Sequence, residues 1–196
     1  MADPDLIAPE DRAAWRAWLE RHHDRPVGVW LLIRKKGSAA PGPSYEEAVE
    51  EALCFGWIDA TTNRHDDDHF RLWFAPRKPR SGWSDSNKRR IDRLIADGRM
   101  TEVGLVKIDA AKADGSWTAL DALEDLTVPD DLAEALEAAA PARAHFDAFP
   151  PGTRKQILFW IRDAKRPATR AKRVAETARL AVENIRVTEW RPKGGA

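Results

Sequence analysis

Aromatic and basic residues crowd the stretch from Phe55 to Ser84, where they could form a site for an anion. From Arg71 this stretch reads RLWFAPRKPRSGWS, with prolines spaced between basic residues and tryptophans on either side. Arginine presents a planar fork of donors to a carboxylate or phosphate, and free amides at a helix N-terminus add positive potential. Pro76 and Pro79 restrict the backbone, which reduces the entropy lost when a ligand orders the loop. The pattern predicts a rigid anion-binding loop.

Seven side chains in this stretch are the candidate ligand-binding residues. The arginines would pair with an anion, the tryptophans would stack on a ligand, and Asp59 would orient an arginine or accept a ligand hydrogen bond. The set is Trp57, Asp59, Trp73, Arg77, Arg80, Trp83 and Ser84. The structural alternative is that the tryptophans belong to the core and the arginines extend along them into water.

An enzyme is the second hypothesis, with Asp59 as the general acid or base. A carboxylate placed between tryptophans can have a raised pKa, although an Asp59 that pairs with Arg71 or Arg77 would be purely structural. Cys54, the single cysteine, follows an apolar helical stripe and is expected to be a buried thiol rather than a nucleophile.

No metal or cofactor is predicted. The segment 65–69 contains two histidines and three aspartates, but it lacks the spacing of a calcium loop and is typical of a polar turn. The chain has no glycine-rich phosphate loop, no dinucleotide fingerprint and no serine nucleophile elbow.

The scaffold of these residues is predicted from periodicity. Residues 28–36 alternate as a strand does, and the β-rich runs 57–64 and 69–75 flank a four-residue polar connection, which indicates an antiparallel hairpin. Alternation then puts Trp57, Asp59, Thr61 and Asn63 on one face of the first hairpin strand, and Arg71, Trp73 and Ala75 on one face of the second.

Helices are predicted around this hairpin and throughout the second half of the chain. Ser44 and Glu47 have the spacing of a capping box, and Ser84 and Thr101 are further candidate N-caps. In the helix that follows Ser84, we expect Ile91, Leu94 and Ile95 to face the core. The last helix, at 168–186, shows an apolar stripe made of Ala171, Val174, Ala175, Ala178, Ala181, Val182 and Ile185.

These elements predict an α+β fold, with a small antiparallel sheet and packed helices in the N-terminal half and only helices in the C-terminal half. We expect an N-terminal region at 1–127 that carries the site, a helical region at 128–190 and a frayed tail at 191–196. With 196 residues, nine tryptophans and 43% apolar residues, the composition is that of a globular chain. Since no signal peptide or membrane segment is recognised, a cytoplasmic location is expected.

Charge is segregated although the 32 basic and 32 acidic residues balance. Residues 71–93 hold eight Lys or Arg and two Asp, which keeps nucleic-acid binding through Arg71–Arg93 as a third hypothesis. The neutral whole chain argues against it, because many nucleic-acid binders are strongly basic. The acidic run 109–147 and the basic run 154–193 are expected to pack together and cover each other.

Several motifs resemble the YdeI/OmpD-associated family, also called bacteriocin-protection proteins. They are SYEEAV at 44–49, ALCFGWID at 52–59, FAPRKPRSGWS at 74–84, GRM at 98–100, GL at 104–105, AKADG at 111–115 and AKRPATR at 164–170. The resemblance covers nearly the whole chain, and the helical region 128–190 is similar to the family's module. It implies a role in stress or antimicrobial resistance and supplies no catalytic residue. The leading hypothesis is thus a cytoplasmic binding protein for a small anionic or aromatic molecule, or for an acidic segment of a protein partner.

Overall fold

The structure, a computed structural model, describes residues 6–187 and divides into two compact units. The N-terminal unit ends at Leu120, and the C-terminal unit begins at Asp121. The tail expected to be frayed, at 191–196, lies outside the described residues. No helix between residues 6 and 187 is both long and apolar enough to cross a bilayer.

The N-terminal unit combines a four-stranded sheet with helices, and the predicted α+β class is confirmed. Its strands are β1 (Leu6–Ile7), β2 (Val29–Arg34), β3 (Trp57–Arg64) and β4 (His69–Pro76), in the spatial order β1-β2-β4-β3. The predicted hairpin is confirmed, since β3 and β4 pair antiparallel, and β4 pairs antiparallel with β2. The short β1, which runs parallel to β2, was not predicted.

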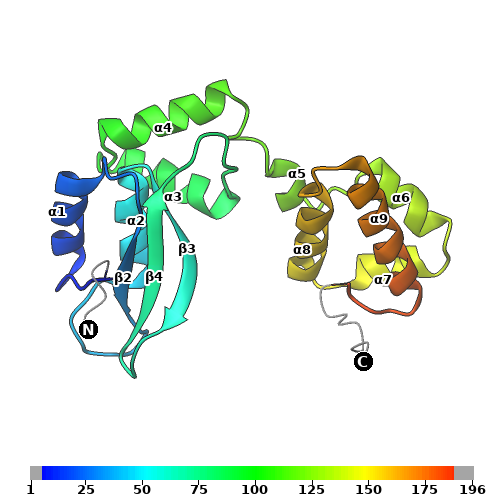
Figure 1. Ribbon diagram of the computed structural model, residues 1–196, viewed down its shortest axis with the longest axis horizontal. Helices are drawn as coiled ribbons and strands as arrows, with labels where there is room; N and C mark the ends of the chain where they lie inside the picture. Colours follow the sequence, from blue (N-terminus) through cyan, green and yellow to red (C-terminus); the bar gives the residue numbers. More distant parts are fainter. Residues whose placement is uncertain (1–5, 188–196) are drawn as a thin grey trace. The chain divides into compact units, whose positions relative to one another are not determined.

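Helices pack on the sheet and extend from it (Figure 1). They are α1 (Arg12–His22), α2 (Tyr45–Cys54), α3 (Asp85–Ala96) and α4 (Glu102–Ala113). Side chains of α1 and α2 join one face of the sheet in the core, where Trp15, Leu31 and Phe74 are fully buried. The predicted capping box of Ser44 and Glu47 is formed, and Ser84 and Thr101 cap α3 and α4. Ile95 is 48% exposed, so the expectation that it faces inward is wrong.

A β-bulge changes the predicted faces of β3. Asp59 pairs with Phe74 and Thr62 with Leu72, so three steps along β3 match two along β4. The extra residue moves Asn63 to the opposite face from Trp57 and Asp59, and the predicted common face of these residues is wrong beyond Asp59.

A buried ion cluster ties α1 to α2 and to the segment after α3. Glu51 is 1% exposed and accepts hydrogen bonds from Arg12 Nε at 2.5 Å, from Arg16 Nη1 at 2.8 Å and from Arg99. Arg16 also donates to the carbonyl oxygen of Arg99 at 3.3 Å. A buried carboxylate is tolerated only when its acceptor sites are filled in this way.

The C-terminal unit consists of helices in the residues that the structure describes. They are α5 (Asp121–Glu124), α6 (Asp130–Glu137), α7 (Ala142–Ala148), α8 (Pro151–Arg162) and α9 (Pro167–Val182). Two ion pairs, Lys155–Glu124 and Arg170–Asp131, join the basic helices to the acidic ones, in line with the expectation that these segments cover each other.

The buried face of α9 differs in part from the predicted stripe. Ala171, Ala175 and Val182 are exposed, and Thr177 is buried instead. The Thr177 hydroxyl donates to the carbonyl oxygen of Arg173 at 2.8 Å, so its polar group is satisfied within the helix. Alanine is small enough to lie on either face, which is why the pattern misplaced the stripe.

Candidate functional site

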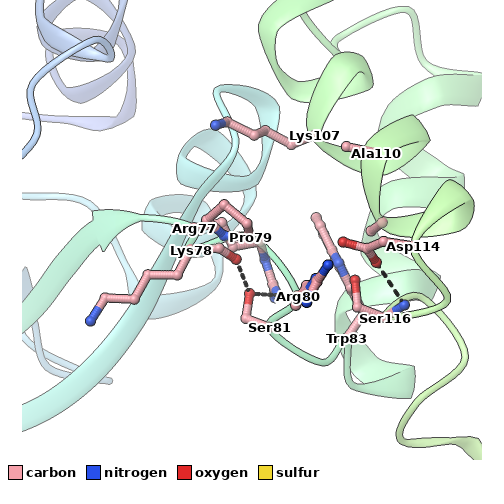
Figure 2. A pocket seen from close by; sticks show the side chains of 11 residues that line it. Arg77, Lys78, Pro79, Arg80, Ser81, Trp83, Lys107, Ala110, Asp114 and Ser116 are labelled. Atoms are coloured by element: carbon pink, nitrogen blue, oxygen red, sulfur yellow. Dashed lines mark hydrogen bonds between the residues drawn. The ribbon is translucent and has the colours of Figure 1, made fainter.

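The candidate site is a pocket in the N-terminal unit, between the loop 77–83 and the C-terminal half of α4 (Figure 2). The loop connects β4 to α3 and contributes most of the cationic side chains, and α4 contributes the opposite wall. The volume of the pocket is about 90 Å³. This is room for one carboxylate or phosphate group, since pockets for drug-sized ligands measure roughly 300–1,000 Å³. The lining residues are Arg77, Lys78, Pro79, Arg80, Ser81, Trp83, Lys107, Ala110, Ala111, Asp114 and Ser116.

Arg77 is the unusual residue of this pocket because it is a buried cation, only 6% exposed. Its Nη1 donates to the carbonyl oxygen of Gly82 at 3.0 Å, and its guanidinium carbon lies 3.5 Å from the centre of the Trp83 ring. Among residues 6–187 no carboxylate forms an ion pair with Arg77, and its Nε has no hydrogen-bond partner there. The charge is therefore incompletely compensated.

The electrostatics of Arg77 follow from this burial. Desolvation lowers the pKa of the Arg77 guanidinium to about 10, against the opposing effect of the negative charge on Asp59. Below this pH the side chain keeps its positive charge, although burial disfavours it. An anion in the pocket would supply the missing compensation.

Arg80 lies at the mouth of the pocket in a backbone conformation that is rare for arginine. Its φ is +60°, and the amide of Ser81 donates to the carbonyl oxygen of Lys78, which closes a tight turn through Pro79. Proline followed by a residue of positive φ is the pattern of a type II turn, where glycine or asparagine is favoured at the second position. A non-glycine residue held there costs about 1–3 kcal/mol, and such strain concentrates at binding sites.

The other cations extend from the rim. Figure 2 shows Lys78 and Lys107 reaching outward from the residues at the centre of the pocket. The stem of Lys107 packs against Gly56, where an added Cβ would lie 2.6 Å from its Cγ. These two lysines add positive potential at the entrance rather than contacts at the floor.

The structure brings together three of the seven sequence-predicted site residues: Arg77, Arg80 and Trp83 line the same pocket. Trp83 is 2% exposed and its ring stacks under Arg77, so it forms the floor and does not offer a free face to an aromatic ligand. Ser84 is placed next to this loop but serves as the N-cap of α3, where its Oγ accepts from the amide of Asn87 at 3.4 Å.

The remaining three predicted residues lie elsewhere in the same unit. Trp57 is fully buried, and its Nε1 donates to the carbonyl oxygen of His23 at 2.9 Å. Trp73 lies on the other face of the sheet, edge-to-face with Trp30 at 5.3 Å. Asp59 accepts from the hydroxyl of Tyr45 at 3.1 Å and acts on Arg77 only through its charge. The predicted grouping of Trp57 and Trp73 around one ligand is not what the structure shows.

The wall formed by α4 was missed by sequence reasoning. Lys107, Ala110 and Ser116 lie outside the recognised motifs, and Asp114 lies in the AKADG motif at 111–115 but was not singled out as a site residue. The available signal was Gly104, because a glycine inside a helical pattern costs stability and often marks a close approach of another segment. An added Cβ at Gly104 would lie 2.3 Å from the carbonyl oxygen of Cys54, so α4 rests directly on the end of α2.

A larger hollow, of about 430 Å³, surrounds the Glu51 cluster and includes Arg12, Arg16, Arg34 and Arg99 in its lining. Three of these arginines donate to Glu51, and Arg34 donates to the carbonyl oxygens of Gly42 and Ser38. Because three of its four arginines are already paired with a carboxylate, this hollow is a weaker candidate for an anion than the pocket at Arg77.

The basic run 71–93 is partly neutralised in the folded chain. Arg90 and Arg93 form ion pairs with Glu46, and Arg89 pairs with Asp85. A continuous basic surface for nucleic acid is therefore interrupted along α3. Among residues 6–187 no three potential ligands from His, Cys, Asp and Glu gather in a metal-binding arrangement.

Cys54 is expected to be unreactive in the native protein. It is buried, and desolvation together with the nearby Glu51 raises the pKa of its thiol to about 11. Since the thiolate is the reactive form, alkylation by iodoacetamide at neutral pH should be at least about 100-fold slower than in the urea-unfolded chain. Comparable rates in the two states would show that Cys54 is accessible and activated.

Two family models match the chain. One, described as "Domain of unknown function (DUF8412)", matches residues 7–107, which is more than half of the chain. The other, described as "Bacteriocin-protection, YdeI or OmpD-Associated", matches residues 125–184 and confirms the resemblance there. The motifs between 44 and 105 that carried the same resemblance fall under the first model instead. Neither a curated protein nor a solved structure matches the chain.

Proposed function

Because the chain belongs, through residues 7–107, to the family described as "Domain of unknown function (DUF8412)", we propose a function for its N-terminal unit from the pocket alone: it binds a small anion at Arg77 and Arg80. The observation that carries the proposal is the buried Arg77 charge without an ion-pair partner in the described residues. Fully desolvated cations are normally paired, and a carboxylate or phosphate group in the pocket would complete the pairing.

The anionic part of the ligand hypothesis has the stronger support. The ring of Trp83 is covered by Arg77 and the ring of Trp57 is buried, so stacking of an aromatic ligand on them has no free surface. An acidic side chain of a protein partner would satisfy the same pocket as a small molecule. From the description of the family that matches residues 125–184 we further propose a role in bacteriocin or stress resistance, and we retain the cytoplasm as the expected location.

Arg80→Asn is expected to weaken the binding of inorganic sulfate about 10- to 100-fold, as loss of a charge-assisted hydrogen bond does. Asparagine tolerates the positive φ of this position better than arginine does, so the variant should fold and be at least as stable as the native protein. Isothermal titration with sulfate measures the affinity, and urea unfolding measures the stability.

The matched control for this variant is Arg89→Asn, which removes the same charge from an exposed position on α3 outside the pocket. It should bind sulfate as the native protein does, apart from the small effect of one distant charge. Equal affinities of the Arg80→Asn, Arg89→Asn and native proteins would refute the proposed site.

Sulfate affinity is also expected to fall as the pH rises through 10. The Arg77 guanidinium is positive below its pKa of about 10 and neutral above it, whereas sulfate keeps its charge, so binding is strong at pH 8 and weakened about fourfold at pH 10.5. The measurement uses a Lys78→Arg, Lys107→Arg double variant, because the two substituted arginines keep the charge of the rim constant over this range. An affinity that does not change with pH in this variant would exclude Arg77 from the site.

A further inference from the structure

Asp114 is the only carboxylate that lines the pocket among the residues that the structure describes. It is the C-cap of α4, and its Oδ1 accepts from the amide of Ser116 at 2.9 Å. The C-terminus of a helix carries partial negative charge, which makes a carboxylate there locally unfavourable. The side chain is exposed to water, and a cation outside the helix would offset this unfavourable effect further.

This cation is Arg80, toward which the carboxylate points in Figure 2. Two hydrogen bonds from Ser116 and then the charge and backbone amide of Arg80 lower the pKa of Asp114, so the carboxylate is ionised at neutral pH. An arginine at positive φ and an acid at the negative end of a helix each break a local preference, and here they meet. Such coincident exceptions mark functional positions.

The hydrogen-bond capacity of Asp114 is not exhausted by these neighbours. An ionised carboxylate accepts about four hydrogen bonds. The amide of Ser116 supplies one at 2.9 Å, and the Ser116 hydroxyl and the Arg80 amide act as neighbouring donors that lower the pKa of the carboxyl. Because Asp114 is exposed, its remaining acceptor capacity is open to a ligand in the pocket, which has room for a single anionic group.

We propose that Asp114 determines the specificity of the pocket and selects anions that carry a hydrogen-bond donor, a hydroxyl or an ammonium, next to the anionic group. This inference rests on the proposed anion site. Arg77 and Arg80 bind the anionic group, and Asp114 accepts the hydrogen bond of the neighbouring donor. A second anion in that place is repelled by the carboxylate, which disfavours bisphosphates and dicarboxylates of short spacing. The ligand class is a hydroxylated or amino-substituted phosphate or carboxylate.

The test compares, by isothermal titration, two phosphate monoesters that share an ethyl chain: ethyl phosphate and 2-aminoethyl phosphate, which carries an ammonium group at the end of that chain. The native protein is expected to bind the aminoethyl ester about 3- to 10-fold more tightly, which is the net effect of one hydrogen bond whose acceptor is exposed to solvent, as Asp114 is. This preference would run against the lower net negative charge of that ester. In Asp114→Asn the preference should disappear, because the attraction of the ammonium for the carboxylate is lost, while binding of ethyl phosphate persists or improves.

Asp109→Asn is the matched control, since Asp109 is an exposed acid of the same helix that does not line the pocket. It should keep the native preference. A preference that survives in Asp114→Asn, or equal binding of the two esters by the native protein, overturns the inference and leaves the anion site intact. Failure of both esters and of sulfate to bind the native protein overturns the anion site itself.

Discussion

Glu51→Gln is expected to lower the free energy of unfolding of the N-terminal unit by about 3–5 kcal/mol, the effect of breaking a buried ion pair from one side. The carboxylate of Glu51 is the shared acceptor of Arg12, Arg16 and Arg99. Glutamine has nearly the same shape but leaves three guanidinium groups facing a neutral amide, one end of which is itself a donor. Urea unfolding followed by tryptophan fluorescence measures the loss and reports chiefly on the N-terminal unit, which holds seven of the nine tryptophans.

Glu20→Gln is the control for this substitution. Glu20 also pairs with Arg16, at 3.4 Å, but its side chain is 55% exposed, and exposed pairs contribute about 0–1 kcal/mol. A loss in Glu51→Gln no larger than in Glu20→Gln would show that the cluster does not hold α1, α2 and Arg99 together.

Gly104→Ala is expected to destabilise the N-terminal unit by about 1–3 kcal/mol and to abolish sulfate binding. The new Cβ would lie 2.3 Å from the backbone oxygen of Cys54, an oxygen that also accepts from the hydroxyl of Thr101 at 2.5 Å. Since a backbone atom cannot rotate away, α4 must move off the end of α2. That displacement carries Asp114 and Ala110 away from Arg80, so the pocket loses one wall.

Gly152→Ala provides the comparison, because this glycine lies in the first turn of α8 and an added Cβ there would meet no atom within 4 Å. Alanine is the better helix former by about 1 kcal/mol, so this variant should be as stable as the native protein or more stable. Native stability and sulfate affinity in Gly104→Ala would mean that α4 does not rest on Cys54 as described.

Local interactions explain why much of the fold could be predicted. The caps at Ser44, Ser84 and Thr101 depend on residues three positions away, and the hairpin of β3 and β4 depends on two runs joined by a polar turn. Arg77 and Arg80 were found in the same manner, since the prolines that shape their loop are adjacent to them in sequence.

Long-range packing explains what could not be predicted. The bulge between Asp59 and Thr62 depends on how β3 meets β4, and it removed Asn63 from its expected face. Asp114 joins Arg80 only because α4 folds back onto the end of α2. The tryptophans show most clearly what the sequence cannot predict. Residue type alone does not distinguish Trp57, which is buried in the core, from Trp83, which forms the floor of the pocket.

The left-handed turn at Arg80 has a consequence for reading other sequences of this family. If the arginine side chain had no role, substitutions at this position would favour glycine or asparagine, because either residue forms the turn with less strain than arginine. An arginine retained there in spite of the strain thus indicates that its side chain is needed, which cannot be said of most surface arginines. In a newly sequenced relative, the residue at this position can sort the proteins that have kept the pocket from those that have kept only the fold.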